Sequence, residues 1–220
     1  MYPWVTHMHT HLAGECPHRC KYCYVQRNPH GVHPRWKGKL RLIEEELKIN
    51  YGLGKTIFIE HMSDLFSEWT FPNWIQAILS HCRRYPDNIY VIQTKCPTRI
   101  LNYLTFFPKK FIVGTTIESN RPYSETRADP PIARYRGMKE LKKLAIETFV
   151  TIEPIMDFDL EVLIKWLKNI KPAFVNIGAD SKRSNLPEPP AEKVKELIGE
   201  LRKITEVKIK SNLNRILKGS

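Results

Sequence analysis

The stretch "NIYVIQTKCPTRILNYLTFF", residues 88–107, contains one complete unit of a strand and a helix. Its first eight residues are rich in β-branched and aromatic side chains, which are typical of a buried strand. Pro97 and Thr98 then form a start signal for a helix, and apolar residues follow at three- and four-residue steps. The stretch therefore predicts a strand over 88–95 and a helix over 98–107.

The same order of strand and helix recurs along the chain. Six such units that end on a seventh strand predict an α/β fold with a parallel sheet and crossover helices. The pattern by itself fits both an open or partial (β/α) barrel and a doubly wound sheet. The other predicted strands are 4–11, 55–62, 109–119, 147–156, 174–180 and 206–213. The other predicted helices are 40–49, 73–85, 132–144, 160–170 and 191–204.

Polar side chains stand at the carboxyl ends of several predicted strands. In parallel α/β folds, binding and catalytic sites are built at this edge of the sheet. The pattern therefore predicts that the functional surface lies there. The residues concerned are Ser63, Asp64, Gln93, Lys95, Glu118, Ser119, Glu153 and Asn176.

Length and composition indicate one globular domain. The chain has 220 residues, of which 42% are hydrophobic and 26% charged, and these fractions are ordinary for a globular protein. No apolar run approaches the roughly 20 residues that span a bilayer, and the first residues lack the layout of a signal peptide. We therefore expect a single domain over 1–220, in a cytoplasmic and monomeric protein that does not bind a membrane.

Three of the five cysteines are crowded into "CPHRCKYC", residues 16–23. An odd number of cysteines with one tight group does not fit a disulfide framework, and clustered thiols more often hold metal. A 4Fe–4S cluster normally takes one thiolate for each iron, so three thiolates leave one iron open. An open position is what a catalytic metal needs. The spacing therefore predicts a cluster on Cys16, Cys20 and Cys23, with a small molecule on the open iron.

A zinc site is the alternative for these thiols, with His18, His30 or His33 as the fourth ligand. Zinc sites usually combine two short-spaced ligands with a distant second pair, and the sequence has no second pair of cysteines. In this interpretation the protein is a zinc-stabilised nucleic-acid-binding module without catalysis.

The cysteine motif resembles the signature of the radical S-adenosylmethionine (SAM) superfamily, C-x3-C-x-aromatic-C, with Tyr22 at the aromatic position. The stretches "MSDLF" (62–66), "QTKCPTRI" (93–100) and "TIEPIMD" (151–157) resemble the branch near spore photoproduct lyase and the small phage-type proteins. This resemblance implies an open partial (β/α)6 TIM-type barrel with parallel strands, plus a short C-terminal strand.

The resemblance also implies the cofactors and the reaction. SAM binds the open iron of the 4Fe–4S cluster through its amino and carboxylate groups. One-electron reduction then gives methionine and a 5′-deoxyadenosyl radical, which abstracts hydrogen from the substrate. A reductant protein such as ferredoxin or flavodoxin is implied as a partner.

Several SAM contacts follow from the resemblance. Tyr22 is expected against the adenine, and Ser63 and Asp64 stand where the superfamily has a stretch that binds the methionine amino group. The alternative for Ser63 and Asp64 is that they cap a following turn.

Two further strands contribute expected contacts. Glu118 and Ser119 stand where the resemblance implies contacts with the ribose hydroxyls, and a carboxylate can accept two such donors. Arg134 is expected to bind the methionine carboxylate as a fork, with Arg127 as the second choice and a surface salt bridge as the alternative for both. Glu153 lies between apolar residues and before a proline, so we expect it in the site.

His7, His9 and His11 occupy alternate positions of the first predicted strand and so share one face. If that face points into a barrel, His9 is a candidate proton donor to the substrate. The alternatives are a hydrogen-bonded polar lining and a mononuclear metal site.

Two cysteines lie outside the cluster motif. The resemblance to spore photoproduct lyase implies a cysteine that returns a hydrogen atom to a product radical, and Cys96 is the candidate for this role. Cys82 is expected to be a buried small hydrophobe.

The formal net charge is +12, from 35 Lys and Arg against 23 Asp and Glu. Residues 16–43 contain no acidic residue, and Lys182 and Arg183 add a second basic segment after the sixth strand. Clustered cations with interleaved aromatics are typical of a surface that binds phosphates and bases. An anionic substrate, favouring nucleic acid, is therefore predicted. The alternatives are that these cations balance the charge of the cofactors, and that the substrate is a peptide or metabolite. The cations of 16–43 are Arg19, Lys21, Arg27, Arg35, Lys37, Lys39 and Arg41.

Overall fold

The computed structural model describes residues 2–218, and within them seven parallel strands form one sheet. The spatial order is β1-β4-β5-β6-β7-β8-β9. Each strand of this sheet therefore lies beside the strand of the same sheet that precedes it in the sequence. β1 and β9 are the two free edges. The strands are β1 (His7–His9), β4 (Thr56–Ile59), β5 (Ile89–Gln93), β6 (Phe111–Thr116), β7 (Thr148–Ile152), β8 (Phe174–Ile177) and β9 (Glu206–Ile209).

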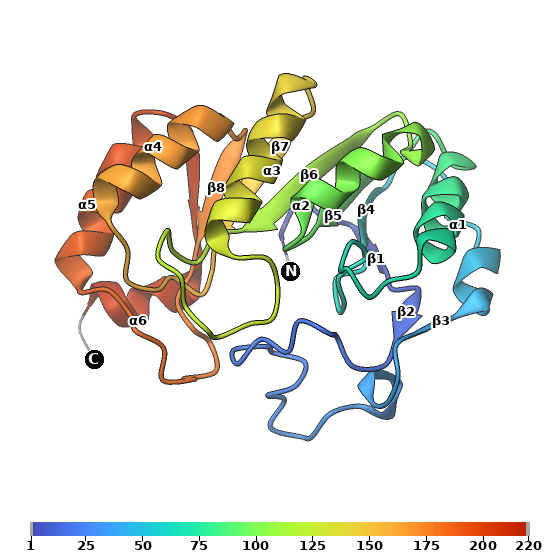
Figure 1. Cartoon of the computed structure of the whole chain (residues 1–220), viewed down its shortest axis with the longest axis horizontal. Helices are drawn as coiled ribbons and strands as arrows, with labels where there is room; N and C mark the ends of the chain where they lie inside the picture. The colour runs from blue at the N-terminus through green and yellow to red at the C-terminus, as the bar shows by residue number, and fades with distance from the viewer. Residues whose placement is uncertain (1, 219–220) are drawn as a thin grey trace.

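Helices follow the strands and lie in an arc outside them (Figure 1). The predicted α/β fold, an open partial barrel with a short last strand, is confirmed. The helices are α1 (Pro72–Arg83), α2 (Pro97–Ile100) continued by a 3₁₀ segment (Leu101–Phe106), α3 (Pro131–Lys143), α4 (Leu160–Ile170), α5 (Ala191–Arg202) and α6 (Asn214–Leu217). None of the helices between residues 2 and 218 is long and apolar enough to cross a membrane.

The predicted helix over 40–49 is wrong. Its first residues form β3 (Arg41–Leu42), which pairs antiparallel with β2 (Leu12–Ala13). The next amide, of Ile43, donates to the carbonyl of His11 at 2.7 Å. Pairing with the segment before the cysteines uses these backbone groups, so only a short 3₁₀ helix (Glu44–Lys48) remains.

Two hydrophobic clusters cover the two faces of the sheet. The larger lies between the strands and the helices, where Ile75, Ile78 and Leu79 of α1 are fully buried. The smaller lies on the concave face, and its core includes Tyr2 and Phe149. The N-terminal segment thus lies inside the arc of strands, where the N label stands in Figure 1.

Gly114→Ala is expected to destabilise the fold by about 1–3 kcal/mol through overpacking. A Cβ at this position in β6 would lie 2.1 Å from Cζ of Phe149, whose ring belongs to the inner cluster. The matched control is Gly199→Ala in α5, where nothing lies within 4 Å, and alanine there is expected to be neutral or stabilising. Urea denaturation of both variants measures the difference, and equal effects would refute the steric explanation.

Candidate active site at the carboxyl edge of the sheet

A cavity of about 570 Å³ lies at the carboxyl ends of the strands. Binding sites for small molecules commonly measure roughly 300–1,000 Å³. Its lining combines the cysteine loop with several strand ends, so the fold brings together segments that are far apart in the sequence. Of the residues predicted for the site, the lining includes Cys16, Cys20, Tyr22, Cys23, Ser63, Asp64 and Glu153.

The cysteine loop is fixed by backbone hydrogen bonds to two other segments. The Gly14 amide donates to the Arg35 carbonyl at 2.8 Å, and the Arg127 amide donates to the His18 carbonyl at 2.7 Å. Gly14 has a φ of 93°, and a Cβ there would lie 2.2 Å from the carbonyl oxygen of Lys39. Only glycine therefore allows this close approach at the start of the loop.

The three thiols of the loop are half-buried, and all five cysteines of the described chain are free of disulfides. Burial raises the pKa of Cys16 to about 12, with the nearby Asp64 carboxylate adding to the effect. Burial also raises the pKa of Cys23. The raised pKa values mean that the protonated thiols are favoured without a metal. A bound metal cation would instead favour the thiolates, because it stabilises their negative charge directly.

His18 connects the cysteine loop to the strand ends. Its Nε2 lies 2.8 Å from Oδ2 of Asp64, and both side chains are buried. Asp64 also accepts from Thr94 Oγ1 at 2.7 Å and from the Lys95 amide at 2.7 Å. Asp64 is therefore already engaged by protein donors and holds the loop in place. Its neighbour Ser63 differs, because its buried hydroxyl has no hydrogen-bond partner among residues 2–218.

Glu118 lies at the centre of a buried charged cluster. Its Oε2 accepts from Nη1 of Arg134 at 2.6 Å, and its Oε1 accepts from the Lys95 ammonium and the Tyr22 hydroxyl. Burial alone would raise the pKa of Glu118, but the charges of Arg134 and Lys95 outweigh it and hold the pKa well below its usual range. Burial and the Glu118 charge raise the pKa of Tyr22. Arg134 and Glu118 thus satisfy each other in this structure.

Glu118 and Arg134 line a second cavity of about 290 Å³ and not the larger one. Tyr22 lines both cavities and so separates them. Ser119 is fully buried, and its hydroxyl donates to the Asp157 carbonyl at 2.6 Å. Glu118 and Arg134 therefore lie across Tyr22 from the predicted residues of the larger cavity, and Ser119 lines neither cavity.

Acid is expected to destabilise the protein through Glu118 and Asp64. The pKa of Asp64 is also lowered: burial opposes this, but His18 and the hydrogen bonds outweigh it. With folded pKa values below the unfolded ones, the stabilisation is complete above about pH 5 and is lost as the pH falls, by up to about 1.4 kcal/mol per pH unit for each group. Urea denaturation between about pH 6 and about pH 3 tests this, and Glu118→Gln should flatten the dependence. A pH-independent stability in that range would contradict it.

His7 and His9 of β1 do not line the cavity, so the condition under which His9 was a candidate proton donor is not met. Met8 lines the cavity, and its neighbours point to the opposite face because side chains alternate along a strand. His9 stacks on Tyr51 with 4.4 Å between ring centroids. His11 is buried, with Nδ1 2.9 Å from Oε1 of Glu60. His9 is therefore not placed to act on a molecule in the cavity.

The two remaining cysteines also lie outside the cavity lining. Cys96 is 5% exposed at the start of α2, and burial raises the pKa of its thiol. Cys82 is fully buried in α1, as predicted. Cys96 thus lies close to the strand ends, but its side chain is buried and does not reach the cavity.

Several lining residues were not assigned a role from the sequence. Gln93 and Lys95 stand at the end of β5, where the polar strand ends gave a signal. Lys210 follows β9 and forms an ion pair with Glu153. Tyr2 had no sequence signal, because its place in the cavity depends on how the N-terminal segment folds back into the sheet.

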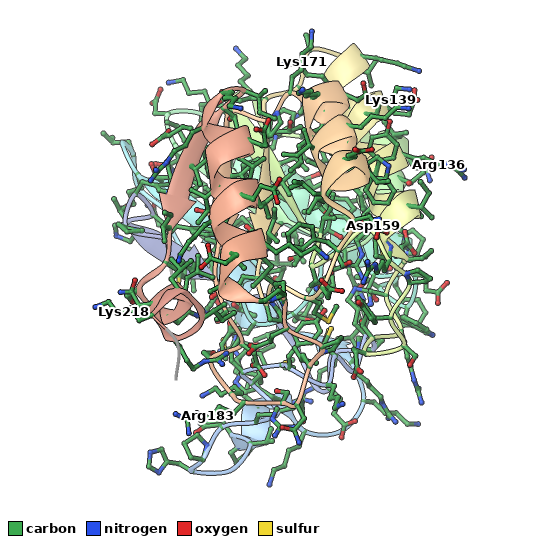
Figure 2. The ribbon with its side chains drawn as sticks, turned by 90° about the vertical axis from the view of Figure 1, so that its left-hand side faces the viewer. Arg136, Lys139, Asp159, Lys171, Arg183 and Lys218 are labelled. Atoms are coloured by element: carbon green, nitrogen blue, oxygen red, sulfur yellow. The ribbon has the colours of Figure 1, made fainter. Side chains whose placement is uncertain are left out.

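Most cations of residues 16–43, which we call the basic loop, lack acidic partners. Arg19, Lys21 and Arg35 form salt bridges with Glu15, Glu125 and Glu46. In the part of the chain that the structure describes, no salt bridge involves Arg27, Lys37, Lys39, Arg41, Lys182 or Arg183. Figures 1 and 2 show the loop that carries Arg183 at the same end of the molecule as the basic loop. This end of the molecule therefore presents unpaired cations beside the cavity.

The fold is shared with proteins of known structure. A spore photoproduct lyase mutant with bound AdoMet and dinucleoside spore photoproduct matches with a TM-score of 0.62 and 10% identity, over 91% of this chain and 74% of that chain. SuiB from Streptococcus suis bound to the precursor peptide SuiA matches with a TM-score of 0.68 and 9% identity, over 94% of this chain. The chain spans 49% of SuiB. At these identities the likeness concerns the fold.

Sequence comparison gives a family. No curated protein matches the sequence significantly. The model of the family "Protein of unknown function (DUF5131)" matches residues 11–167, which include the three clustered cysteines and the strand ends from β4 to β7. Since this match covers more than half of the chain, the protein belongs to the DUF5131 family.

Proposed function

We propose that this chain is a radical SAM enzyme with one core domain over 1–220, and that it modifies or repairs a nucleic acid. One observation carries the proposal: Cys16, Cys20 and Cys23, from one loop, all line the cavity that collects the polar strand ends. The likeness in fold to an AdoMet-bound spore photoproduct lyase and to SuiB supports it.

The donor set suits a 4Fe–4S cluster better than a single ion. Among residues 2–218, no group of three or more His, Cys, Asp or Glu side chains could hold one metal ion. A cluster takes each thiolate on a different iron, so its ligands lie farther apart than those of one ion. The proposed zinc ligand His18 contacts Asp64 through Nε2 and keeps Nδ1 unpartnered, but it forms no three-ligand group with the thiols of the described chain, and His30 and His33 are exposed. Cys16, Cys20 and Cys23 would hold the cluster, which supplies the electron for reductive cleavage of SAM.

The chain's own residues would bind and orient SAM. The unpartnered Ser63 hydroxyl is available to a ligand, and Asp64 keeps the cysteine loop in position through His18. Tyr22 is held by Glu118 and Lys95, so its ring forms a fixed wall. We retain Ser119, Glu118 and Arg134 as proposed contacts of the ribose and the methionine carboxylate, and the buried Glu118–Arg134 pair keeps that side of Tyr22 in place.

The unpaired cations beside the cavity support an anionic polymer as substrate. A nucleic acid bound through phosphates loses affinity steeply as salt rises, because binding releases counterions. A ferredoxin or flavodoxin remains our proposal for the reductant.

The test is anaerobic reconstitution with iron and sulfide, followed by SAM and dithionite. We expect iron and sulfide near the content of one 4Fe–4S cluster per chain, and 5′-deoxyadenosine by mass spectrometry. About one zinc per chain without deoxyadenosine would refute the proposal and favour the zinc module. Deoxyadenosine formation that responds to peptides but not to oligonucleotides would retain the chemistry and overturn the substrate.

A further inference from the structure

The inner wall of the cavity is formed by side chains that no role above uses. We define it as Tyr2, Phe58, Gln93, Thr116 and Thr151, all of which line the cavity. Phe58, Gln93, Thr116 and Thr151 come from four neighbouring strands, β4 to β7, and Tyr2 comes from the N-terminal segment. The wall is therefore a surface that only the folded sheet assembles.

A directed chain of hydrogen bonds runs through this wall. The Tyr2 hydroxyl donates to Oε1 of Gln93 at 2.6 Å, since an amide oxygen only accepts. A phenol has one proton, so at the 2.7 Å contact between Tyr2 and Thr151 the threonine donates. Asn176 Nδ2 donates to Thr151 Oγ1 at 3.2 Å, and Gln93 Nε2 donates to Thr116 Oγ1 at 3.0 Å. Tyr2 thereby fixes which way the Gln93 amide points.

The chain of bonds leaves specific groups free for a ligand. Gln93 keeps a second N–H and a second lone pair on its oxygen, and it is half-buried at the cavity. The Thr116 hydroxyl accepts from Gln93, and its own proton has no acceptor among the described residues. The wall therefore presents donors and an acceptor side by side, beside the apolar surfaces of Phe58 and Met8.

The charges around the inner wall indicate whether it binds a charged or a neutral group. The lysines that line the cavity within the described chain are Lys95 and Lys210, and each is paired with a glutamate, Glu118 and Glu153. A carboxylate or phosphate that entered would meet no unpaired ammonium. The unpaired cations are instead on the basic loop outside.

We propose that the inner wall binds one unpaired nucleobase of the substrate, while the phosphates stay on the basic loop. Gln93 reads the edge of the base, as glutamine amides read bases elsewhere, and Tyr2 is a positioning residue that orients Gln93. Phe58 and Met8 pack against the base. A base inside a duplex cannot reach this wall, so the base is single-stranded or flipped out of its helix. The inference rests on the proposed function for its substrate, and it names the recognised part of that substrate.

The test uses reconstituted protein and fluorescent five-residue oligonucleotides that are abasic except for one position. That position carries adenine, cytosine, guanine, thymine or no base. We expect at least one base to tighten binding by roughly 5- to 100-fold over the fully abasic probe, as stacked and hydrogen-bonded bases do. Equal affinity for all probes would overturn the inference. So would competition by tetraglutamate for the base-dependent part of binding.

Variants of the inner wall test whether its side chains cause the preference for a base. Tyr2→Phe keeps the ring but frees Gln93, so the base preference should fall by about 5-fold or more. Gln93→Ala should remove the difference in affinity between the four bases, while packing on Phe58 and Met8 still favours a base over the abasic probe, and Tyr2→Phe added to Gln93→Ala should have no further effect. The matched control is Tyr85→Phe, whose hydroxyl makes a 3.5 Å contact with the Ile49 carbonyl away from the cavity. An unchanged base preference in Tyr2→Phe would contradict the positioning role.

Two further measurements keep the outcomes separate. If Tyr2→Phe fails to fold, Thr116→Val tests the same wall from another strand, and an unchanged base preference there would count against the proposal. Deoxyadenosine formation is assayed on the same wild-type sample without oligonucleotide. Deoxyadenosine without a base preference would overturn this inference and leave the radical SAM proposal standing. A base preference without a cluster or deoxyadenosine would overturn the radical SAM proposal and support the binding wall alone.

Discussion

Cys20→Ala is expected to reduce the formation of 5′-deoxyadenosine to background. Each thiolate of a 4Fe–4S cluster holds a different iron, so the loss of one ligand leaves the cluster incomplete. Cys20 lines the cavity from the middle of the loop, with its Sγ 3.1 Å from Oγ1 of Thr126. The measurements are iron and sulfide content, the visible absorption of the reconstituted protein, and deoxyadenosine by mass spectrometry.

The matched control for Cys20→Ala is Cys82→Ala. Cys82 is fully buried in α1 and lies outside the cavity lining, so its replacement should leave cluster content and deoxyadenosine formation unchanged. Cys16→Ala and Cys23→Ala should behave like Cys20→Ala. Full iron content and activity in any of these three variants would show that the loop does not ligate a cluster.

Arg134→Met is expected to lower the free energy of unfolding by about 3–5 kcal/mol, because it leaves the buried Glu118 without its main partner. Arg134 is fully buried, Glu118 is 1% exposed, and the two lie 2.6 Å apart. Lys95 remains beside Glu118 and offsets part of the cost. In a protein of this size the loss corresponds to a fall in Tm of about 6–20 °C. Urea denaturation of the apo protein measures it.

Two comparisons make the Arg134 result specific. Lys203→Ala removes an exposed pair with Glu200 and should cost less than about 1 kcal/mol. Adding Glu118→Leu to Arg134→Met should restore part of the lost stability, because no buried charge then remains unpaired. A loss as small as that of Lys203→Ala would mean that solvent reaches Glu118 in the folded protein.

The elements that sequence predicted best are those whose signals are local. The strand over 88–95 and its helix start at Pro97 appear as β5 (Ile89–Gln93) and α2 (Pro97–Ile100). The failure over 40–49 has a non-local cause, since Leu42 pairs with Leu12 across a loop that periodicity does not describe. Apolar spacing cannot tell a short strand from a helix when a distant segment supplies the backbone partners.

The candidate site was likewise predictable only in part. Its position at the strand ends, and the crowding of Cys16, Cys20 and Cys23, were readable because parallel strands carry their carboxyl ends to one edge. The partnership of Glu118 with Arg134 and the separation of two cavities by Tyr22 were not readable, because they depend on side-chain directions at residues 16 to 96 positions apart.

By itself, the sequence determined an α/β fold with a parallel sheet, the edge at which the polar side chains gather and the loop that offers three thiols. Only the tertiary structure decided that Met8 and not His9 faces the cavity, and that Tyr2 completes its inner wall. The physical reason is that strand periodicity fixes which residues share a face, whereas the face that becomes concave is chosen by packing. Here the rings of Tyr2, Phe149 and Phe174 pack on that concave face.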